Sequence, residues 1–297
     1  VDVPLDLDYT RIAGTAEFDL MEAGRLTLRG SLFEEDRGNG TPLSRNATES
    51  GRLHAKWEWE DGSGSSWRTD AWYWDTEYQS TFSSVFGDRS SEVLVLDQYA
   101  VPSEAFGASL VRSARLGNSG RLVLGSDLRW IEGATNERVV FQGGDRRAGG
   151  EQLLWGAFAE ATGQTESGSW LAGLRMDYWK NHAGFLQQPN QPRDAFPDRE
   201  KWIFSARVGG TRQVADVLCL RGAVYQAFRV PTLNELYRPF RVGDDLTTAN
   251  ATLDPERLLG AEAGFDCQLS GELTVSGTVY YNTVRDPVLN VTVGQSA

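Results

Sequence analysis

The sequence contains few of the residues from which most catalytic and metal sites are built. Among its 297 residues are 2 Cys, 2 His and 2 Met. Cys219 and Cys267 match neither a disulfide framework nor a zinc-binding spacing. His54 and His182 lie far apart in the chain, which argues against a His-based metal site. We therefore expect no metal site and no cofactor.

Motifs of catalysis are missing as well. The chain has no Cys–His pairing, no G-x-S-x-G sequence, no Walker loop and no carboxylate–histidine cluster of useful spacing. Its adjacent acids, such as Glu34-Glu35 and Asp244-Asp245, fall in predicted loops and are interpreted as solvated charge. The sequence therefore predicts a protein that is not an enzyme.

An excess of positive charge and a long apolar run are also absent. Lys and Arg number 29 against 41 Asp and Glu, for a net charge of −12, which argues against nucleic acid as a partner. No run approaches the roughly eighteen apolar residues of a membrane helix. The mean hydropathy of −0.40 is typical of soluble proteins. It does not exclude a membrane barrel, in which only alternate residues face lipid.

The dominant pattern is an alternation of apolar and polar residues with period two, which is typical of β-strands. In residues 50–60, for example, Leu53, Ala55, Trp57 and Trp59 alternate with charged residues. The pattern predicts twelve strands: 9–20, 25–34, 50–60, 66–79, about 103–115, 121–131, 152–163, 169–180, 201–211, 217–229, 257–269 and 273–286.

The connections between these strands alternate between short turns and long loops. The long loops are predicted near 35–48, 80–102, 133–150, 183–200 and 230–256. Such alternation is typical of an up-and-down sheet in an outer membrane, with turns on one rim and loops on the other. We therefore expect all five loops on one rim.

The two faces of the predicted strands support a membrane wall. The apolar face carries small residues, and its aromatic residues often lie near strand ends, as in the girdles at membrane interfaces. The opposite face carries charges of both signs, which a solvated or protein-filled lumen accepts. A soluble sheet with one solvated face is the alternative. The predicted lumen charges are Arg11, Glu17, Arg29, His54, Glu58, Asp127, Arg129, Glu160, Arg175, Asp177, Arg207, Arg221, Glu262 and Asp266.

The same alternation predicts two free thiols. In 217–229 it places Cys219 on the lumen face, and in 257–269 it places Cys267 on the lipid face. Side chains on opposite faces of paired strands cannot meet the geometry of a disulfide.

The most informative stretch runs from Tyr225 to Phe265 and holds two short motifs. The first is AFRVPTLNELY at 227–237, and the second is NATLDPE at 250–256, followed by Glu262 and Gly264. Pro231 and Pro255 lack the N–H that a central strand needs, so they bracket a loop. The motif residues are Phe228, Arg229, Pro231, Thr232, Leu233, Asn234, Glu235, Leu236, Tyr237, Asn250, Leu253, Pro255, Glu256, Glu262 and Gly264.

These motifs resemble the barrel region of TonB-dependent outer-membrane receptors and transporters. There an AFRAPTLNELY segment leaves one strand and an NPxLxPE…E.G segment enters the next. Ala251 stands where the family usually has Pro. The resemblance implies an all-β fold, an antiparallel up-and-down transmembrane barrel of about 22 strands filled by a plug. Residues 1–297 are then expected to form a partial barrel domain of about twelve strands, open at both edges, without the plug and the C-terminal strands.

The resemblance also implies a function. The family takes up scarce solutes such as ferric siderophores or cobalamin across the outer membrane of Gram-negative bacteria. The expected partners are outer-membrane lipid, TonB acting through the plug, and a small-molecule or metal-chelate solute, with the complete protein a monomer. A passive porin or structural barrel and a secreted all-β binding module are the alternatives.

Solute recognition is expected at the rim that carries the long loops, where aromatic and charged side chains reach the lumen mouth. The candidate ligand-binding residues are Tyr99, Tyr237, Arg238, Phe240 and Arg241.

Overall fold

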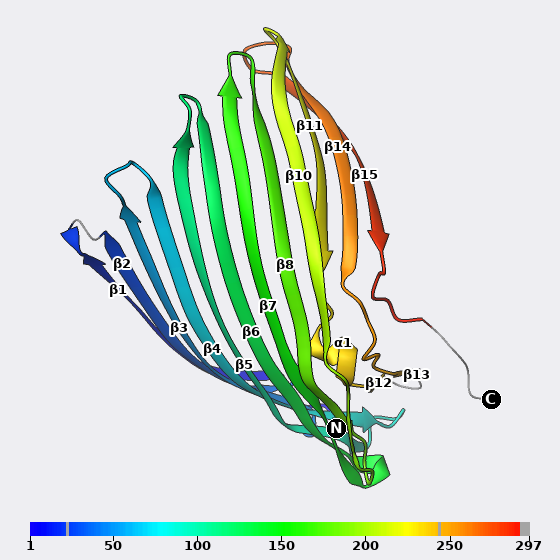
Figure 1. Cartoon of the computed structure of the whole chain (residues 1–297). Coiled ribbons are helices and arrows are strands. Elements are labelled where there is room, and N and C mark those ends of the chain that lie inside the picture. The colour runs from blue at the N-terminus through cyan, green and yellow to red at the C-terminus, as the bar shows by residue number, and fades with distance from the viewer. Residues whose placement is uncertain (22–23, 243–244, 292–297) are drawn as a thin grey trace.

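A computed structural model describes residues 1–21, 24–242 and 245–291 of the chain (Figure 1). Its main element is one curved antiparallel sheet of thirteen strands, of which twelve follow each other in chain order as β1-β2-β3-β4-β5-β6-β7-β8-β10-β11-β14-β15. The sheet does not close, since β1 and β15 are its two edges. The predicted all-β meander with open edges is therefore confirmed. None of the described helices is long and apolar enough to cross a membrane.

The strands match the predicted positions, and most are longer than predicted. Their bounds are β1 Asp6–Asp19, β2 Arg25–Gly38, β3 Arg45–Glu60, β4 Ser66–Val85, β5 Glu92–Leu116, β6 Gly120–Val139, β7 Gly144–Thr165, β8 Gly168–Gln187, β10 Arg199–Ala215, β11 Leu218–Arg229, β14 Glu256–Gln268 and β15 Thr274–Arg285.

Several predicted loops are largely strand, and their bounds were wrong. The loop expected at 80–102 shrinks to 86–91, and the loop expected at 133–150 holds only the 3-10 turn η2 (Val140–Gln142). Toward the loop rim the apolar alternation fades while the backbone ladder continues, so alternation alone ends these strands too early. Of the five predicted loops, 230–256 stays long, and it contains a short helix α1 (Leu233–Tyr237) that alternation did not predict.

Three small strands accompany these elements. β9 (Arg193–Ala195) pairs with β8, and β12 (Phe240–Val242) pairs with β13 (Asp245–Thr247) inside the long loop. They lie with α1 and η2 at one rim of the sheet, opposite the short turns (Figure 1). In a meander of consecutive antiparallel strands, alternate connections share an edge, so the expected grouping of the loops on one rim is confirmed.

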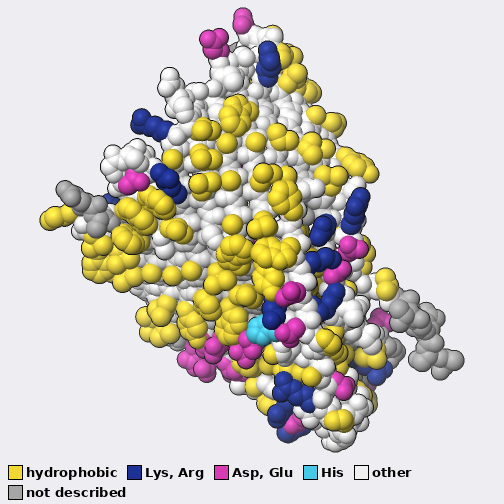
Figure 2. Space-filling model, in the orientation of Figure 1, with side chains coloured by type: hydrophobic (Ala, Val, Ile, Leu, Met, Phe, Trp, Pro, Cys, Tyr) yellow, Lys and Arg dark blue, Asp and Glu magenta, His cyan; other side chains and the backbone are white. Residues whose placement is uncertain are grey.

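One face of the sheet is apolar and open to its surroundings. Leu53, Phe204 and Val208 are 64%, 59% and 57% exposed. Near the loop rim Trp202 packs against Trp155 and Tyr178 with ring centroids 6.0 and 5.0 Å apart. Figure 2 shows hydrophobic side chains over most of the face in view, with charged side chains gathered mainly toward its lower end. So large an exposed apolar area marks a surface that meets a membrane or another protein.

The opposite face carries the predicted lumen charges, many of them in ion pairs. Arg175 pairs with Asp127 at 2.7 Å and with Asp177 at 2.6 Å. Arg221 pairs with Asp266 at 2.6 Å, and the partners lie on the same strand or one or two strands away. Charges of opposite sign are thus matched across the ladder, which lowers the cost of placing them on an inner wall.

The register of the strands also determines on which face of the sheet each of the two cysteine side chains lies. In the β11–β14 ladder Cys219 is paired with Asp266, and Leu218 with Cys267. Directly paired residues point to the same face, so the two cysteines point to opposite faces. Both are free, as predicted.

Candidate functional site

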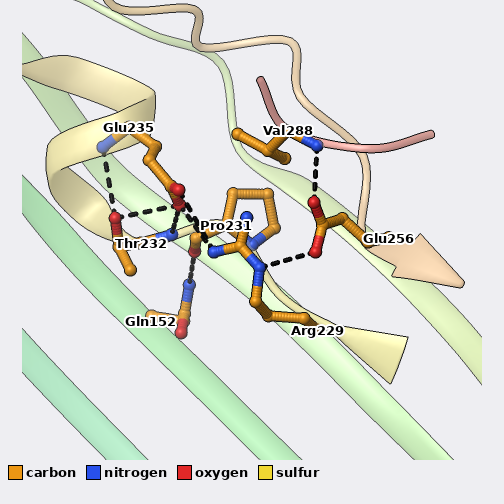
Figure 3. A network of polar contacts seen from close by, with 7 residues as sticks. All are labelled: Gln152, Arg229, Pro231, Thr232, Glu235, Glu256 and Val288. Carbon is orange, nitrogen blue, oxygen red and sulfur yellow. Dashed lines mark hydrogen bonds and ion pairs between the residues drawn. The ribbon is translucent and has the colours of Figure 1, made fainter. Parts of the chain in front are cut away.

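The loop between β11 and β14 (residues 230–255) begins and ends at one ion-pair network. Arg229, the last residue of β11, donates from Nε to Glu256 at 2.6 Å and from Nη1 to Glu235 at 3.0 Å. Glu256, the first residue of β14, also accepts from the backbone N–H of Val288 at 2.5 Å. Figure 3 shows the carboxylates of Glu235 and Glu256 converging on the guanidinium of Arg229. The network fastens both ends of the loop and the start of α1 together.

Helix α1 starts at a capping box formed by the motif itself. The side chain of Thr232 accepts from the backbone N–H of Glu235, and the carboxylate of Glu235 accepts from the backbone N–H of Thr232 at 2.7 Å. Such reciprocal bonds satisfy two N–H groups that a helix start leaves free. The preceding carbonyl, that of Pro231, accepts from Gln152 Nε2 at 2.9 Å, which fixes the helix to β7 (Figure 3).

The helix packs onto the inner wall through its last two residues. Leu236 and Tyr237 are 1% and 3% exposed. The ring of Tyr237 stacks on Phe196 at 5.4 Å and lies over Gly150 and Gly184, where an added Cβ would overlap the ring. Burial raises the pKa of Tyr237. The two glycines therefore make room on β7 and β8 for a side chain from the loop.

A buried carboxylate holds the next part of the loop. Glu137 on β6 is 1% exposed and accepts from Arg146 Nε at 2.5 Å and from Arg238 Nη2 at 3.0 Å. Gln98 adds a third donor at 3.3 Å. Two guanidinium groups thus share one carboxylate, which ties residue 238 of the loop to β6 and β7.

The far end of the loop is clamped to β10. Asp254 accepts from Lys201 and from Arg199, both at 2.8 Å, and Arg199 also donates to the carbonyl of Leu253 at 2.6 Å. The hydrogen bond from Lys201 and the two nearby positive charges hold the pKa of Asp254 below its usual value. The loop is therefore fixed to the wall at its start, middle and end.

A cavity of about 590 Å³ lies between this loop and the inner face of β5, β6 and β7. Its lining includes Arg129, Arg229 and Arg238 and contains no acidic residue. Apolar side chains such as Ile131 and Leu154 form much of the rest. The cavity therefore combines an apolar wall with three arginines, of which Arg229 and Arg238 are paired with carboxylates outside the lining.

The five predicted ligand-binding residues lie in different surroundings. Arg238 lines the cavity and pairs with Glu137. Tyr237 is buried under the loop. Phe240 is half-buried, and Arg241 is exposed, with its guanidinium 6.0 Å from the ring of Phe141. Tyr99, on β5, is half-buried away from the cavity lining. Four of the five thus belong to the same loop.

Sequence reasoning missed Glu137, Arg146 and Gln152, which hold the loop. Glu137 and Arg146 fell within a predicted loop at 133–150, although they belong to β6 and β7. Gln152 was within a predicted strand, but no local pattern indicated its bond to residue 231. The ion pair between Glu137 and Arg146 could have been predicted only if the β6–β7 ladder had been extended to these two residues, which are directly opposite each other in it.

Residues 3–297 match the family profile described as TonB dependent receptor-like, beta-barrel. No curated protein sequence matches the chain.

Solved structures share the fold at low sequence identity. The copper transporter OprC superposes with a TM-score of 0.75 at 17% identity, over 95% of this chain and 47% of its own. The ferric-catecholate import receptor Fiu from E. coli K12 gives 0.72 at 11% identity, over 94% of this chain and 52% of its own. The ferripyoverdine receptor of Pseudomonas aeruginosa gives a TM-score of 0.67 at 14% identity, over 94% of this chain and 42% of its own. The chain thus spans about half the length of the structures it matches.

Proposed function

The chain belongs to the TonB-dependent receptor β-barrel family, and from this premise we propose that the complete protein takes up a scarce solute across the outer membrane with energy delivered through TonB. The observation that carries the proposal is the family match over residues 3–297. It agrees with a wall whose apolar face is exposed and whose inner face carries a fastened loop. Solutes of the chemical kind of a ferric siderophore or cobalamin are the first candidates.

We further propose that residues 1–297 are a partial barrel domain, completed by further strands and a plug. Two observations support this. The sheet is open at β1 and β15, and the chain covers only 47% and 52% of the two first-named structures. An open strand edge in a membrane leaves backbone groups unpaired, which the hydrocarbon does not tolerate. Completion by further strands satisfies those groups.

We propose that the loop rim faces the outside of the cell and that solute meets the protein there. The girdle around Trp202 lies near that rim, and the arginine-lined cavity lies directly beneath the loop. In this proposal Tyr99, Phe240 and Arg241 contact solute at the mouth. Arg238, which is tied to Glu137, contributes positive charge to the cavity wall, and Tyr237 holds the loop in place.

Uptake measurements on whole cells test the function. A strain lacking the gene, complemented with the full-length gene, is screened for uptake of labelled ferric siderophores, cobalamin, haem and copper. The structural neighbours include a copper transporter, ferric-siderophore receptors and a haemophore receptor, which sets the range of the screen. Gene-dependent uptake of one solute that stops when TonB is deleted supports the proposal. Uptake that continues without TonB indicates a passive channel instead.

Cysteine labelling on intact cells tests the orientation. Single-cysteine variants Asn39→Cys, on the loop rim, and Ser119→Cys, in a short turn, are made in a background free of Cys219 and Cys267. An impermeant maleimide is expected to label position 39 and not position 119. The reverse pattern would place the loop rim in the periplasm and remove the proposed binding mouth.

A further inference from the structure

Two arginines lie side by side on the membrane-facing side of the last two strands. Arg257 of β14 and Arg285 of β15 are directly paired in the ladder. Leu259 pairs with Thr283 and Ala261 with Tyr281 one and two steps further along the same face. Directly paired side chains have Cβ atoms about 5 Å apart. Both guanidinium groups are exposed at the same place on the outer surface.

This pair has no counter-charge within the part of the chain that the structure describes. No side-chain ion pair or hydrogen bond joins either arginine to another described residue. The acids next to them in sequence are Glu256 and Asp286. Glu256 is committed to Arg229 and to the N–H of Val288. Like charges directly opposite each other destabilise a sheet, and a bound anion removes that cost.

The pair lies at the margin of the apolar surface, and the sign of the charge on this margin changes around the wall. Across β4 to β6, Asp75 pairs with Glu104 and Glu104 with Glu132, so that side is acidic. Figure 2 shows acidic side chains below the hydrophobic surface on the left, and Lys and Arg side chains with some acidic side chains among them on the right, where β14 and β15 lie. The margin is thus acidic over β4 to β6, whereas at β14 and β15 the ladder places two arginines opposite each other.

A recess in the wall adjoins the two arginines. β10 and β11 pair only as far as Arg207 and Tyr225, and beyond this point the side chain of Gln226 accepts from the N–H of Ala206 at 3.3 Å. The strands part there, and a cavity of about 280 Å³ lies between them, lined by both arginines, Leu259, Thr283 and Phe204.

A second, largely apolar groove lies further along the same strands, toward the middle of the wall. It has a volume of about 700 Å³, and its lining includes Ala261, Ala263, Val279, Tyr281 and Val224. Positions 257, 259, 261 and 263 are successive outward positions of β14, so they span about 20 Å. That length suits an acyl chain, since one leaflet of hydrocarbon is about 15 Å thick.

We propose that Arg257 and Arg285 bind the phosphate headgroup of a membrane lipid, with one of its acyl chains along the groove over β14 and β15. The guanidinium pair supplies donors and charge that match phosphate oxygens. The small residues Ala261 and Ala263 leave space for the chain beneath. The site is independent of the transported solute and rests only on the outer face meeting lipid.

Native mass spectrometry of the complete protein in detergent, after removal of lipid, tests the site. The probe is dioleoyl phosphatidylglycerol, and the comparator is monoglucosyl dioleoylglycerol, which has the same chains and no phosphate. The variants are Arg257→Gln, Arg285→Gln and both together. Arg138→Gln is the matched control, since Arg138 is an exposed arginine paired with Asp145.

Each single variant is expected to raise the Kd for phosphatidylglycerol about fivefold, and the double variant about 25-fold, as the loss of one or two basic residues near a lipid surface predicts. The control is expected to change the Kd less than twofold. Heat-dependent mobility on gels checks that all variants fold.

Three results overturn the proposal. The first would be a double variant that binds phosphatidylglycerol as tightly as the parent protein. The second would be a phosphate-free comparator that binds the parent protein as tightly as phosphatidylglycerol does. The third would be an Arg138→Gln variant whose binding is weakened as much as that of the double variant. Displacement of the lipid by equimolar inorganic phosphate also overturns it, because the site then recognises a free anion and not a lipid.

Discussion

Arg229 and Glu256 are 27 residues apart in the chain, yet they are directly paired in the β11–β14 ladder, with Nε donating to the carboxylate at 2.6 Å. The whole loop 230–255 is therefore closed at its base by one ion pair. Because Arg229 also binds Glu235, the same contact sets where α1 begins. This relationship makes the loop a fixed part of the inner wall.

Replacing Arg229 should loosen that loop. Arg229→Ala removes both ion pairs, and we expect a loss of about 1–2 kcal/mol of stability, since the groups are partly exposed. Limited proteolysis of the complete protein in detergent should then show faster cleavage within 238–250. Arg229→Lys should be intermediate, because it keeps the charge and loses the forked geometry. Arg37→Ala, which removes an exposed pair with Glu35, is the control and should leave the cleavage rate unchanged.

Glu137 is expected to be more sensitive. Glu137→Gln leaves Arg146 and Arg238 facing each other without their buried carboxylate, at a cost of about 3 kcal/mol. The unfolding temperature should drop by several degrees. Asp145→Asn removes an exposed pair with Arg138 and should cost less than about 1 kcal/mol. Equal effects of the two changes would contradict the role given to Glu137.

The glycine beneath Tyr237 is expected to tolerate no side chain. Gly184→Ala places a methyl group against the ring and should cost about 1–3 kcal/mol. Gly62→Ala meets no atom within 4 Å and should be neutral. Adding Tyr237→Ala to Gly184→Ala should cost less than the sum of the two single changes, because the clash is then gone. Strict additivity in chemical denaturation would argue against this contact.

Acid should release the end of the loop. The pKa of Asp254 is lowered in the folded protein from an ordinary value of 3.8, so its ion pairs add stability above about pH 3.8. That contribution is lost as the pH falls through the folded pKa. Hydrogen exchange of 250–255, corrected for intrinsic rates, should therefore accelerate below pH 3.8. In Asp254→Asn the exchange should be fast at all pH values, and a parent-like pH dependence in that variant would show that another group is responsible.

Both thiols should carry label when the complete protein is denatured and alkylated without reductant. Cys219 is paired with Asp266 and Cys267 with Leu218, so the sulfurs lie on opposite faces of one ladder. Mass spectrometry should find each cysteine peptide alkylated separately. A bridged Cys219–Cys267 peptide would show that the register of β11 or β14 is wrong.

The sequence predicted the twelve main strands, their order and their faces. In a sheet with one apolar and one polar face, successive residues alternate between apolar and polar, so the two-residue period of each strand is visible in the sequence. The placement of Cys219 and Cys267 on opposite faces follows from that period alone. The motif around Arg229 and Pro231 indicated the family, and the match over residues 3–297 confirms it.

Tertiary structure decided where the strands end and how the loop lies. β4 and β5 continue past the end of the apolar alternation, because their backbone ladder persists where local sequence carries no apolar signal. The burial of Tyr237 depends on Gly150 and Gly184, two glycines on other strands. Arg238 meets Glu137 across 101 residues of chain. Such contacts arise only when the register of distant strands brings their side chains together, and no local pattern carries that information.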